Sequence, residues 1–344
     1  MPLGLADIGL LLLSFVVPFA LLLVGLPPFL GFLTRRGRVL DDVHKNPPSK
    51  VPAPVGPALF LAAVIGELVV TVGFRSPVPV AVILGAAVAF GIGLWDDLRV
   101  LGGKAKPVLL ILAGLAFVGL VLFRYDLYSS AINFPLLGDV NPHLTIYTAL
   151  AIVAFPVVAN AFNMMDGFNG EISWFTLLTS VALLIGAALH YAETSGFDLA
   201  RVASTLPLVA VASGFLVFNR YPSRAFDGDS GSLMFGAMFA GLAITSGVEI
   251  AAMIAIVPAI LNSFYTLSSV RGFVERRRMA ARPTYIGDDG LLHASLAPGA
   301  PSTLVRLILL DGPLSEKDLV MSIAYLTLLA CLFSVAISVL TWVI

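Results

Sequence analysis

The sequence predicts an all-α polytopic membrane protein, and three observations carry that prediction. Of its 344 residues, 58% are hydrophobic and only 12% are charged, which is about half the charge usual in a soluble domain. The mean hydropathy is +0.97, and apolar runs about as long as a membrane span recur along the whole chain. The lysines and arginines fall almost entirely in alternate loops between these runs. We therefore expect one integral membrane domain over residues 1–344.

Ten apolar runs are long enough, or nearly so, to cross a bilayer. The first lacks the basic stretch and cleavage site of a signal peptide and is expected to remain as a span. The two runs near residue 247 are separated by Ser246-Gly247-Val248-Glu249. Pro156, Pro207 and Pro258 lie inside runs and are expected to bend or break them. The predicted spans are Ile8–Leu26, Val55–Gly73, Val78–Leu94, Pro107–Phe123, Leu144–Ala161, Ile172–Leu189, Val202–Phe218, Leu233–Thr245, Val248–Leu267 and Leu319–Ile344.

The distribution of cations sets the expected orientation. All but three of the 20 lysines and arginines lie in loops that follow odd-numbered spans. Cytoplasmic loops carry the excess of cations, so both termini are expected to face outward. A single span over 231–267 would place Arg276-Arg277-Arg278 on the outer side, which favours two spans there. The expected cytoplasmic loops are residues 34–54, 95–106, 162–171, 219–232 and 268–318, and a short outward hairpin is expected near 132–143.

The unusual polar residues share the cation-rich face. The stretch GLWDDLRVLGGKAK, residues 93–106, holds Asp96 and Asp97 at the mouth of an apolar run, where carboxylates are costly unless they are used. Each polar cluster also has an ordinary explanation: a helix cap for this pair, a helix-packing stripe for residues spaced by three from Asn160, and a turn for Gly-Asp-Ser-Gly-Ser. Their occurrence together on one face favours a functional site.

The chemistry that these groups suit is phosphoryl transfer. Diphosphate oxygens need a hard cation and positive side chains to offset their charge. Mg²⁺ takes oxygen ligands and keeps several waters, so one carboxylate and one carboxamide would suffice. A transporter or flippase of lipid-linked or nucleotide-linked sugar is an alternative, but it predicts polar groups near the midplane or on both faces. A CDP-alcohol phosphotransferase is a second alternative. The spaced acidic signature of that class does not occur around these aspartates, which disfavours it. A scaffold role is disfavoured by the cost of the carboxylates.

The motifs GLWDDLRVLGGKAK, NAFNMMDGFNGE, FNRYPSRAFDGDSGSLMFG and KVPAPVG resemble those of the polyprenyl-phosphate N-acetylhexosamine-1-phosphate transferases. LDGPLSEKD, residues 310–318, resembles the eukaryotic and archaeal UDP-GlcNAc:dolichyl-phosphate branch. The histidine triplet of the bacterial phospho-MurNAc-pentapeptide translocase is absent from the last loop. The resemblance implies transfer of N-acetylhexosamine-1-phosphate, here GlcNAc-1-phosphate, from a UDP-sugar to a polyprenyl or dolichyl phosphate. UMP is released, as in the first membrane step of N-glycosylation.

The resemblance also implies roles for individual residues. The expected catalytic residues, near the lipid phosphate or the reacting groups, are Asp96, Asp97, Lys106 and Asp166. The expected ligands of Mg²⁺, for which Mn²⁺ can substitute, are Asn163 and Asp229. The expected contacts to the uridine, diphosphate or sugar are Lys50, Asn169, Asn219, Phe226 and Arg282. The resemblance further implies a homodimer in the lipid bilayer, with no nucleic-acid partner. It would lie in the plasma membrane of an archaeon or bacterium, or in the endoplasmic reticulum of a eukaryote, with a cytoplasmic active site.

Overall fold

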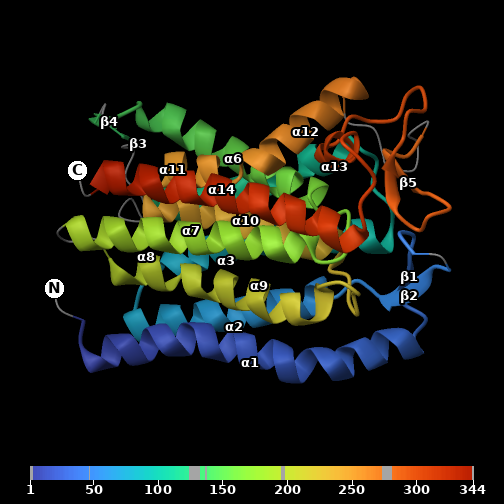
Figure 1. The fold of residues 1–344 in the computed structure, drawn as a ribbon. Coiled ribbons are helices and arrows are strands. Elements are labelled where there is room, and N and C mark those ends of the chain that lie inside the picture. Colours follow the sequence, from blue (N-terminus) through green and yellow to red (C-terminus); the bar gives the residue numbers. More distant parts are fainter. Residues whose placement is uncertain are drawn as a thin grey trace.

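A computed structural model of the chain describes residues 3–45, 47–123, 132–135, 138–194, 198–272 and 281–342. Within these ranges the chain forms a bundle of long helices that run alternately in opposite directions (Figure 1). The start of the first helix and the end of the last lie at one end of the bundle, here called the terminal end. The opposite end, here called the loop end, carries irregular segments and two hairpins. Arg124 and Arg276–Arg278 lie outside the described residues.

Seven helical segments of the described chain are long and apolar enough to cross a membrane, and an eighth forms if a pair bent by 64° counts as one span. The chain is therefore an integral membrane protein. Each predicted apolar run corresponds to one helix or to one broken pair. The helices are α1 (Leu5–Arg35), α2 (Gly56–Phe74), α3 (Val78–Leu98), α4 (Ala105–Leu109), α5 (Ile111–Phe123), α6 (Leu144–Met164), α7 (Glu171–Glu193), α8 (Leu199–Ala203), α9 (Thr205–Asn219), α10 (Gly228–Ser246), α11 (Glu249–Ala255), α12 (Val257–Ser269), α13 (Leu304–Leu309) and α14 (Glu316–Trp342).

Helix α10 is the centre of the bundle. Every residue from Ser230 to Ser246 is buried, so this helix touches other helices and not lipid. Its glycines, alanines and serines let neighbouring backbones approach closely; a Cβ on Gly236 would lie 2.6 Å from the Cα of Ala159 on α6. The glycines and serines also lower the hydropathy of α10, so it is not among the seven apolar segments. The predicted division after it is confirmed, because α10 ends at Ser246 and Gly247 adopts a φ of 62°.

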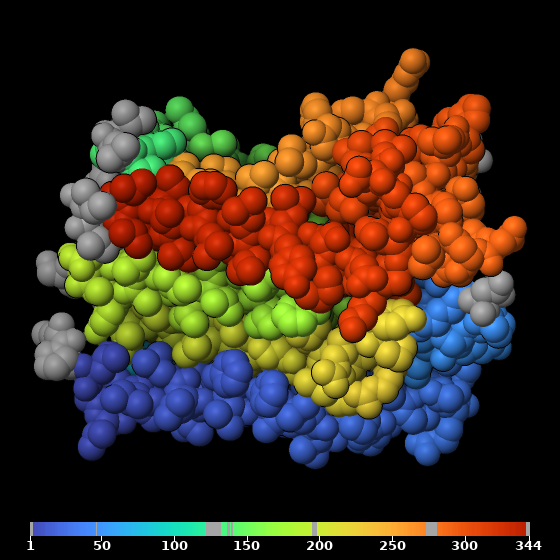
Figure 2. Space-filling model, viewed as in Figure 1, coloured from blue at the N-terminus to red at the C-terminus, as the bar shows by residue number. Residues whose placement is uncertain are grey.

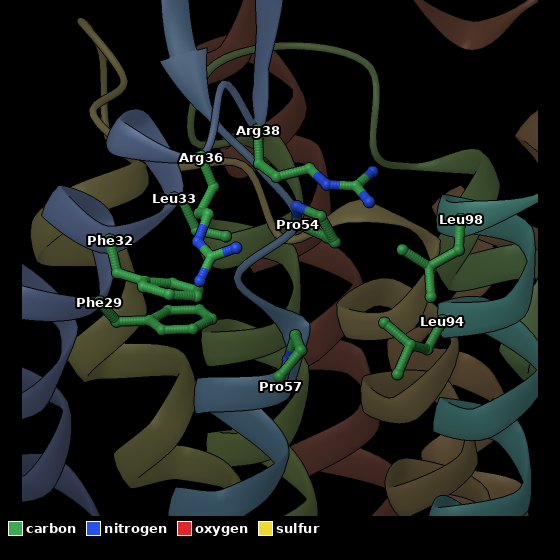
Figure 3. Close-up of a pocket in the computed structure, with 9 residues that line it drawn as sticks. All are labelled: Phe29, Phe32, Leu33, Arg36, Arg38, Pro54, Pro57, Leu94 and Leu98. Carbon is green, nitrogen blue, oxygen red and sulfur yellow. The ribbon is translucent and has the colours of Figure 1, made fainter.

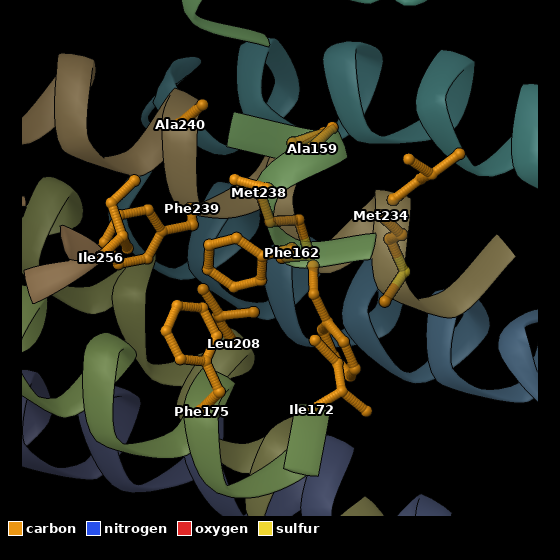
Figure 4. Packing of buried hydrophobic residues seen from close by; sticks show 14 of the residues in the cluster. Ala159, Phe162, Ile172, Phe175, Leu208, Met234, Met238, Phe239, Ala240 and Ile256 are labelled. Carbon is orange, nitrogen blue, oxygen red and sulfur yellow. The ribbon is translucent and has the colours of Figure 1, made fainter. Parts of the chain in front are cut away.

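Aromatic rings from three helices pack together beside α10 (Figure 4). The ring of Phe162 on α6 lies 4.9 Å from that of Phe175 on α7 and 5.4 Å from that of Phe239 on α10, measured between centroids. Phe162, Phe175 and Phe239 are almost completely buried, and each such ring removes a large apolar area from contact with polar groups. On the outside, Figure 2 shows α1 and α14 as two long strips on one face, with α7 and α9 between them.

The expected breaks occur at two of the three prolines. Pro258 is the second residue of α12, directly after the 64° bend between α11 and α12. Pro207 follows the junction of α8 and α9 at Ser204. Helix α6, in contrast, continues through Pro156. A proline in the first turn of a helix lacks only an N–H that has no helical partner anyway, which suits these junctions.

Three short antiparallel hairpins interrupt the all-α architecture. Strands β1 (Val39–Asp42) and β2 (Ser49–Pro52) pair at the loop end, as do β5 (Thr284–Ile286) and β6 (Leu292–Ala294). These two hairpins lie in segments for which only loops were expected. The hairpin expected near 132–143 is present as β3 (Ile132–Phe134) and β4 (Gly138–Val140), at the terminal end. Helices α1, α3 and α6 extend further toward the loop end than predicted. The polar motifs therefore begin on helix ends.

Candidate active site

At the loop end, the side chain of Lys106 joins two of the predicted carboxylates. Its Nζ lies 2.6 Å from Asp96 Oδ2 and 2.5 Å from Asp229 Oδ2. Asp96 is in the last turn of α3, Lys106 is on the short helix α4, and Asp229 is in the first turn of α10. The side chains of Lys106 and Asp96 are 15% and 10% exposed and that of Asp229 is 28% exposed, so water screens these ion pairs less than it screens pairs on an open surface. Three segments thus converge on one ammonium group.

Asp97 faces the start of α10 and caps it. Its Oδ1 accepts a hydrogen bond from the backbone N–H of Asp229 at 2.8 Å. Its Oδ2 accepts from the backbone N–H and the hydroxyl of Ser230, at 3.0 and 2.5 Å. A carboxylate here satisfies N–H groups that lack partners within the helix and interacts favourably with the helix dipole. The helix-cap explanation of the aspartate pair therefore applies to Asp97, which holds Asp229 in position.

Asn163 completes the surroundings of Asp229. Its Nδ2 donates to Asp229 Oδ1 at 2.7 Å and to Ser232 Oγ at 2.9 Å. Asn163 lies in the last turn of α6, which ends one residue later. Asp166 and Asn169 follow beyond this end, so the residues spaced by three do not share one helical face, which would have required the helix to continue to Gly167. The two oxygens of Asp229 are thus held from opposite sides, one by an ammonium group and one by a carboxamide.

A further carboxylate, Asp227, lies beside this cluster and was not singled out by the sequence. Its side chain is fully buried, and neither carboxylate oxygen has a hydrogen-bond partner among the described residues. Burial, followed by the negative charge of Asp166 and then those of Asp97 and Asp229, raises the pKa of Asp227 well above its usual range. The available signal was the first acid of Phe-Asp-Gly-Asp, two residues before Asp229. The charges that raise its pKa show that several carboxylates gather at this end of the bundle.

Asn169 belongs to a second polar cluster at the loop end. Its Nδ2 donates to Asp42 Oδ2 at 2.9 Å, and its backbone N–H donates to Glu316 Oε1 at 2.9 Å. Lys45 pairs with the same Asp42 oxygen at 2.5 Å. The amide oxygen of Asn169 and Oε2 of Glu316 are buried without a hydrogen-bond partner among the described residues. This cluster ties the β1–β2 hairpin and the start of α14 to the loop after α6.

The pKa of Asp42 predicts a specific acid sensitivity. Burial alone would raise it, but hydrogen bonds from Asn169 and Lys45 and the charge of Lys45 outweigh burial and lower the pKa below 3.8. The folded state therefore favours the carboxylate, and the stability gained is complete above the unfolded pKa and lost as the pH falls through the folded one. We expect the difference in melting temperature between wild type and Asp42→Asn to shrink between about pH 5 and pH 3. A constant difference would contradict this, and Asp41→Asn, at an exposed neighbouring position, is the control.

Asn219 is the last residue of α9, and Phe226 lies on the connection from α9 to α10. Asn219 is 1% exposed; its Oδ1 accepts from the Ser173 hydroxyl at 2.7 Å, and its Nδ2 donates to the carbonyl of Ala225 at 3.0 Å. The backbone of Phe226 continues the pairing of β2, since its N–H donates to the Pro52 carbonyl at 3.1 Å. The side chain of Asn219 thus fixes the loop that carries Phe226, and Phe226 itself remains half-buried.

Lys50 and Arg282 stand apart from both clusters. Lys50 is exposed on β2 opposite Asp41, and Arg282 is exposed just before β5. Neither side chain pairs with an acid within the described part of the chain. In the same region, His293 Nε2 lies 3.0 Å from Asp289 Oδ2. The structure thus brings Asp96, Lys106, Asn163 and Asp229 into contact. Lys50 and Arg282 lie exposed at the loop end, outside this cluster.

The donors around Asp229 suit a magnesium ion that also binds substrate. No group of three or more His, Cys, Asp or Glu residues in the described ranges could hold a metal by itself. Asp229 and Asp96 supply carboxylate oxygens, and Asn163 supplies a carboxamide that can present its oxygen after an amide rotation. Mg²⁺ commonly uses one or two carboxylates and takes its other ligands from waters and substrate phosphates. In the structure, the ammonium group of Lys106 contacts Asp96 and Asp229, the same carboxylates that such an ion would contact.

The chain is similar to several known enzymes. The family model described as glycosyl transferase family 4 matches residues 79–247, a range that contains the cluster around Asp229. A protein of Methanocaldococcus jannaschii named as a glycosyltransferase is 30% identical over 81% of each chain. One of Sulfolobus acidocaldarius, named as a UDP-N-acetylglucosamine–dolichyl-phosphate N-acetylglucosaminephosphotransferase, is 25% identical over 96% of this chain and 97% of its own. The phospho-N-acetylmuramoyl-pentapeptide-transferase of Heliobacterium modesticaldum is 33% identical over 69% of this chain and 75% of its own.

Proposed function

The chain belongs to glycosyl transferase family 4 and is a sugar-phosphate transferase, and from this we propose that it transfers GlcNAc-1-phosphate from UDP-GlcNAc to a polyprenyl or dolichyl phosphate. UMP is the second product. The observation that carries the proposal is the contact of Lys106 with Asp96 and Asp229 at 2.6 and 2.5 Å, at one end of a membrane bundle. An ammonium group held by two acids beside a helix start suits a site where phosphate charge must be offset.

In the proposed reaction an oxygen of the lipid phosphate attacks the β-phosphorus of the UDP-sugar. A new P–O bond to the lipid phosphate forms, the bond between the β-phosphorus and the bridging oxygen breaks, and the electron pair leaves with UMP. Lys106 offsets the charge of the reacting phosphates, and Asp96 positions Lys106. The lipid phosphate is largely ionised at neutral pH, so no side chain has to remove a proton first. Asp97 acts through α10, because it holds the backbone of Asp229 and Ser230.

A magnesium ion, for which manganese can substitute, would be held by Asp229 and Asn163. When bound, it would neutralise diphosphate oxygens and stabilise the charge that develops on the leaving group. Lys106 would then give up Asp229 and turn toward the phosphates. Asp166 lies in the adjacent loop, half-buried, where it adds negative charge next to Asp227 and would support the same cation.

The nucleotide is proposed to bind on the side of Phe226. An aromatic ring offers a stacking face for a base, and the loop that carries it is fixed by Asn219. The unpartnered amide oxygen of Asn169 could accept a hydrogen bond from uracil. Lys50 and Arg282, both exposed, would reach toward the diphosphate and the sugar.

GlcNAc is the proposed sugar for two reasons. The last loop lacks the histidine triplet expected of a MurNAc-pentapeptide enzyme, and a relative matched over 96% of this chain is named for UDP-N-acetylglucosamine. We expect the purified protein to use UDP-GlcNAc in preference to UDP-GalNAc and UDP-MurNAc-pentapeptide, with one lipid phosphate supplied to all three. Equal or faster transfer from UDP-MurNAc-pentapeptide would contradict the sugar assignment but leave sugar-phosphate transfer standing.

The proposed topology has ten spans with both termini outward and the loop end in the cytoplasm. It is supported by the gathering of cations in alternate loops and by the return of the last helix to the terminal end (Figure 1). In an archaeon or bacterium the membrane would be the plasma membrane, and the protein would act as a homodimer. Cysteine substitutions in the β1–β2 hairpin and in the β3–β4 hairpin should be labelled by a membrane-impermeant reagent from opposite sides. Labelling of both from the same side would contradict the topology.

A further inference from the structure

A cavity of about 390 Å³ opens between α1 and α3 at the loop end (Figure 3). Its walls are apolar: Phe29, Phe32 and Leu33 on α1 face Leu94 and Leu98 on α3. The side chains of Phe32 and Leu98 are 44% and 53% exposed. They border the hollow on both sides, so the apolar part of a ligand would pack against apolar side chains on both walls.

Two arginines form the polar rim of this cavity. Arg36 follows the last residue of α1, and its guanidinium lies 5.4 Å from the centre of the Phe32 ring. Arg38 extends across the opening toward Leu98 (Figure 3). Neither arginine pairs with a carboxylate in the described chain. A guanidinium presents a fork of N–H donors that fits phosphate, so the rim is ready to bind an anion.

The residues that line the cavity differ from those of the cluster around Asp229. Pro54, which lines the cavity, abuts the start of α10: a Cβ on Gly228 would lie 2.6 Å from the Cβ of Pro54 and 2.7 Å from Oδ1 of Asp97. Pro54 thus stands between the cavity and the N-terminus of α10. No residue that lines the cavity forms a described hydrogen bond or ion pair with Lys106 or Asp229. The arginine rim and the ion pairs of Lys106 therefore involve different side chains.

We propose that this cavity binds an anionic phospholipid, with its headgroup phosphate at Arg36 and Arg38 and one acyl chain between α1 and α3. The combination of apolar walls and an unpaired cationic rim matches the two parts of such a lipid. Free phosphate would leave the walls uncovered, and a zwitterionic lipid would bring its own cation to the two arginines. This site does not depend on the reaction proposed for the enzyme, because it uses none of the same residues.

The test is lipid binding to the purified full-length protein, measured by native mass spectrometry with phosphatidylglycerol and with phosphatidylcholine. The wild type should bind phosphatidylglycerol in preference. The double variant Arg36→Gln, Arg38→Gln should bind it about thirtyfold more weakly, the effect of two arginines near a membrane surface. Arg35→Gln, one position earlier on α1 and not in the cavity, should bind as the wild type does. Melting temperatures measured in the same detergent identify any variant that fails to fold.

The variant Leu98→Trp distinguishes a site for a lipid from a site for a simple anion. It fills the cavity but keeps both arginines, so phosphatidylglycerol binding should fall while the protein remains folded. Undiminished binding in this variant, or displacement of phosphatidylglycerol by an equal concentration of inorganic phosphate, would overturn the proposal in favour of a phosphate site. Equal losses for Arg35→Gln and the double variant would overturn it as well. So would a double variant that binds phosphatidylglycerol normally but needs more polyprenyl phosphate, because the cavity would then serve the acceptor.

Discussion

Asp229→Asn is expected to lower the rate of lipid-linked sugar formation by about 10³-fold, because loss of one preorganised charged group at a phosphoryl-transfer site has effects of this order. The substitution keeps the shape of the side chain and its place next to Asn163 Nδ2. It removes the negative charge that Lys106 contacts at 2.5 Å and the carboxylate proposed to hold magnesium. Initial rates of UMP release at saturating substrates measure this effect.

The matched control for this experiment is Asp41→Asn, the same change at an exposed acid of the β1–β2 hairpin. It should retain activity within about twofold, since surface substitutions away from special features have small effects. Magnesium dependence provides a second readout. When magnesium is limiting, adding more of it should increase the rate of the wild type. The same addition should not increase the rate of Asp229→Asn. Normal turnover in Asp229→Asn would remove Asp229 from the reaction.

Gly93→Ala is expected to lower both activity and stability, whereas Gly91→Ala should do neither. A Cβ at Gly93 would lie 2.4 Å from the carbonyl oxygen of Asp229 and 2.6 Å from the Cα of Ser230. These are backbone atoms, so the start of α10 would have to move away from α3. At Gly91, two residues earlier on the same helix, a Cβ meets nothing within 4 Å.

The sizes of the two effects follow from packing. Overfilling a close contact costs about 1–3 kcal/mol, and a shift of about 1 Å at a reacting group can reduce the rate about a hundredfold. Gly91→Ala should be neutral or stabilise by up to about 1 kcal/mol, because alanine favours a helix over glycine. Melting temperature and UMP release of the two purified variants test the pair. Equal behaviour of the two would contradict the close contact between α3 and α10.

The sequence predicted the helices well wherever hydropathy and turn residues decide the outcome. The separation of α10 from α11 followed from Gly247, whose φ of 62° suits glycine. Alternation of the spans was enough to predict that Asp96, Asn163 and Asp229 would share one end of the bundle. The helix ends were less accurate, as α3 continues to Leu98 and carries the aspartate pair on its last turn.

Contacts between distant segments could not be inferred from local pattern. Asp97 caps a helix that begins 131 residues later, and nothing around Asp97 indicates that partner. Asn169 binds Asp42 across 127 positions and Glu316 across 147. In the same way, the cavity beside Arg36 requires α1 to continue past Pro27 and Pro28. Such features depend on how helices pack, which composition and periodicity do not determine.

The proposed reaction is tested most directly by following the β-phosphate of the donor. Purified protein in detergent is supplied with UDP-GlcNAc labelled with ³²P at the β-phosphate, magnesium and polyprenyl phosphate. We expect the label to enter the lipid fraction together with GlcNAc, with an equal amount of UMP released and no product without polyprenyl phosphate. Release of labelled UDP would mean that the sugar alone is transferred. Uptake of intact UDP-GlcNAc into proteoliposomes without lipid product would mean that the protein is a transporter.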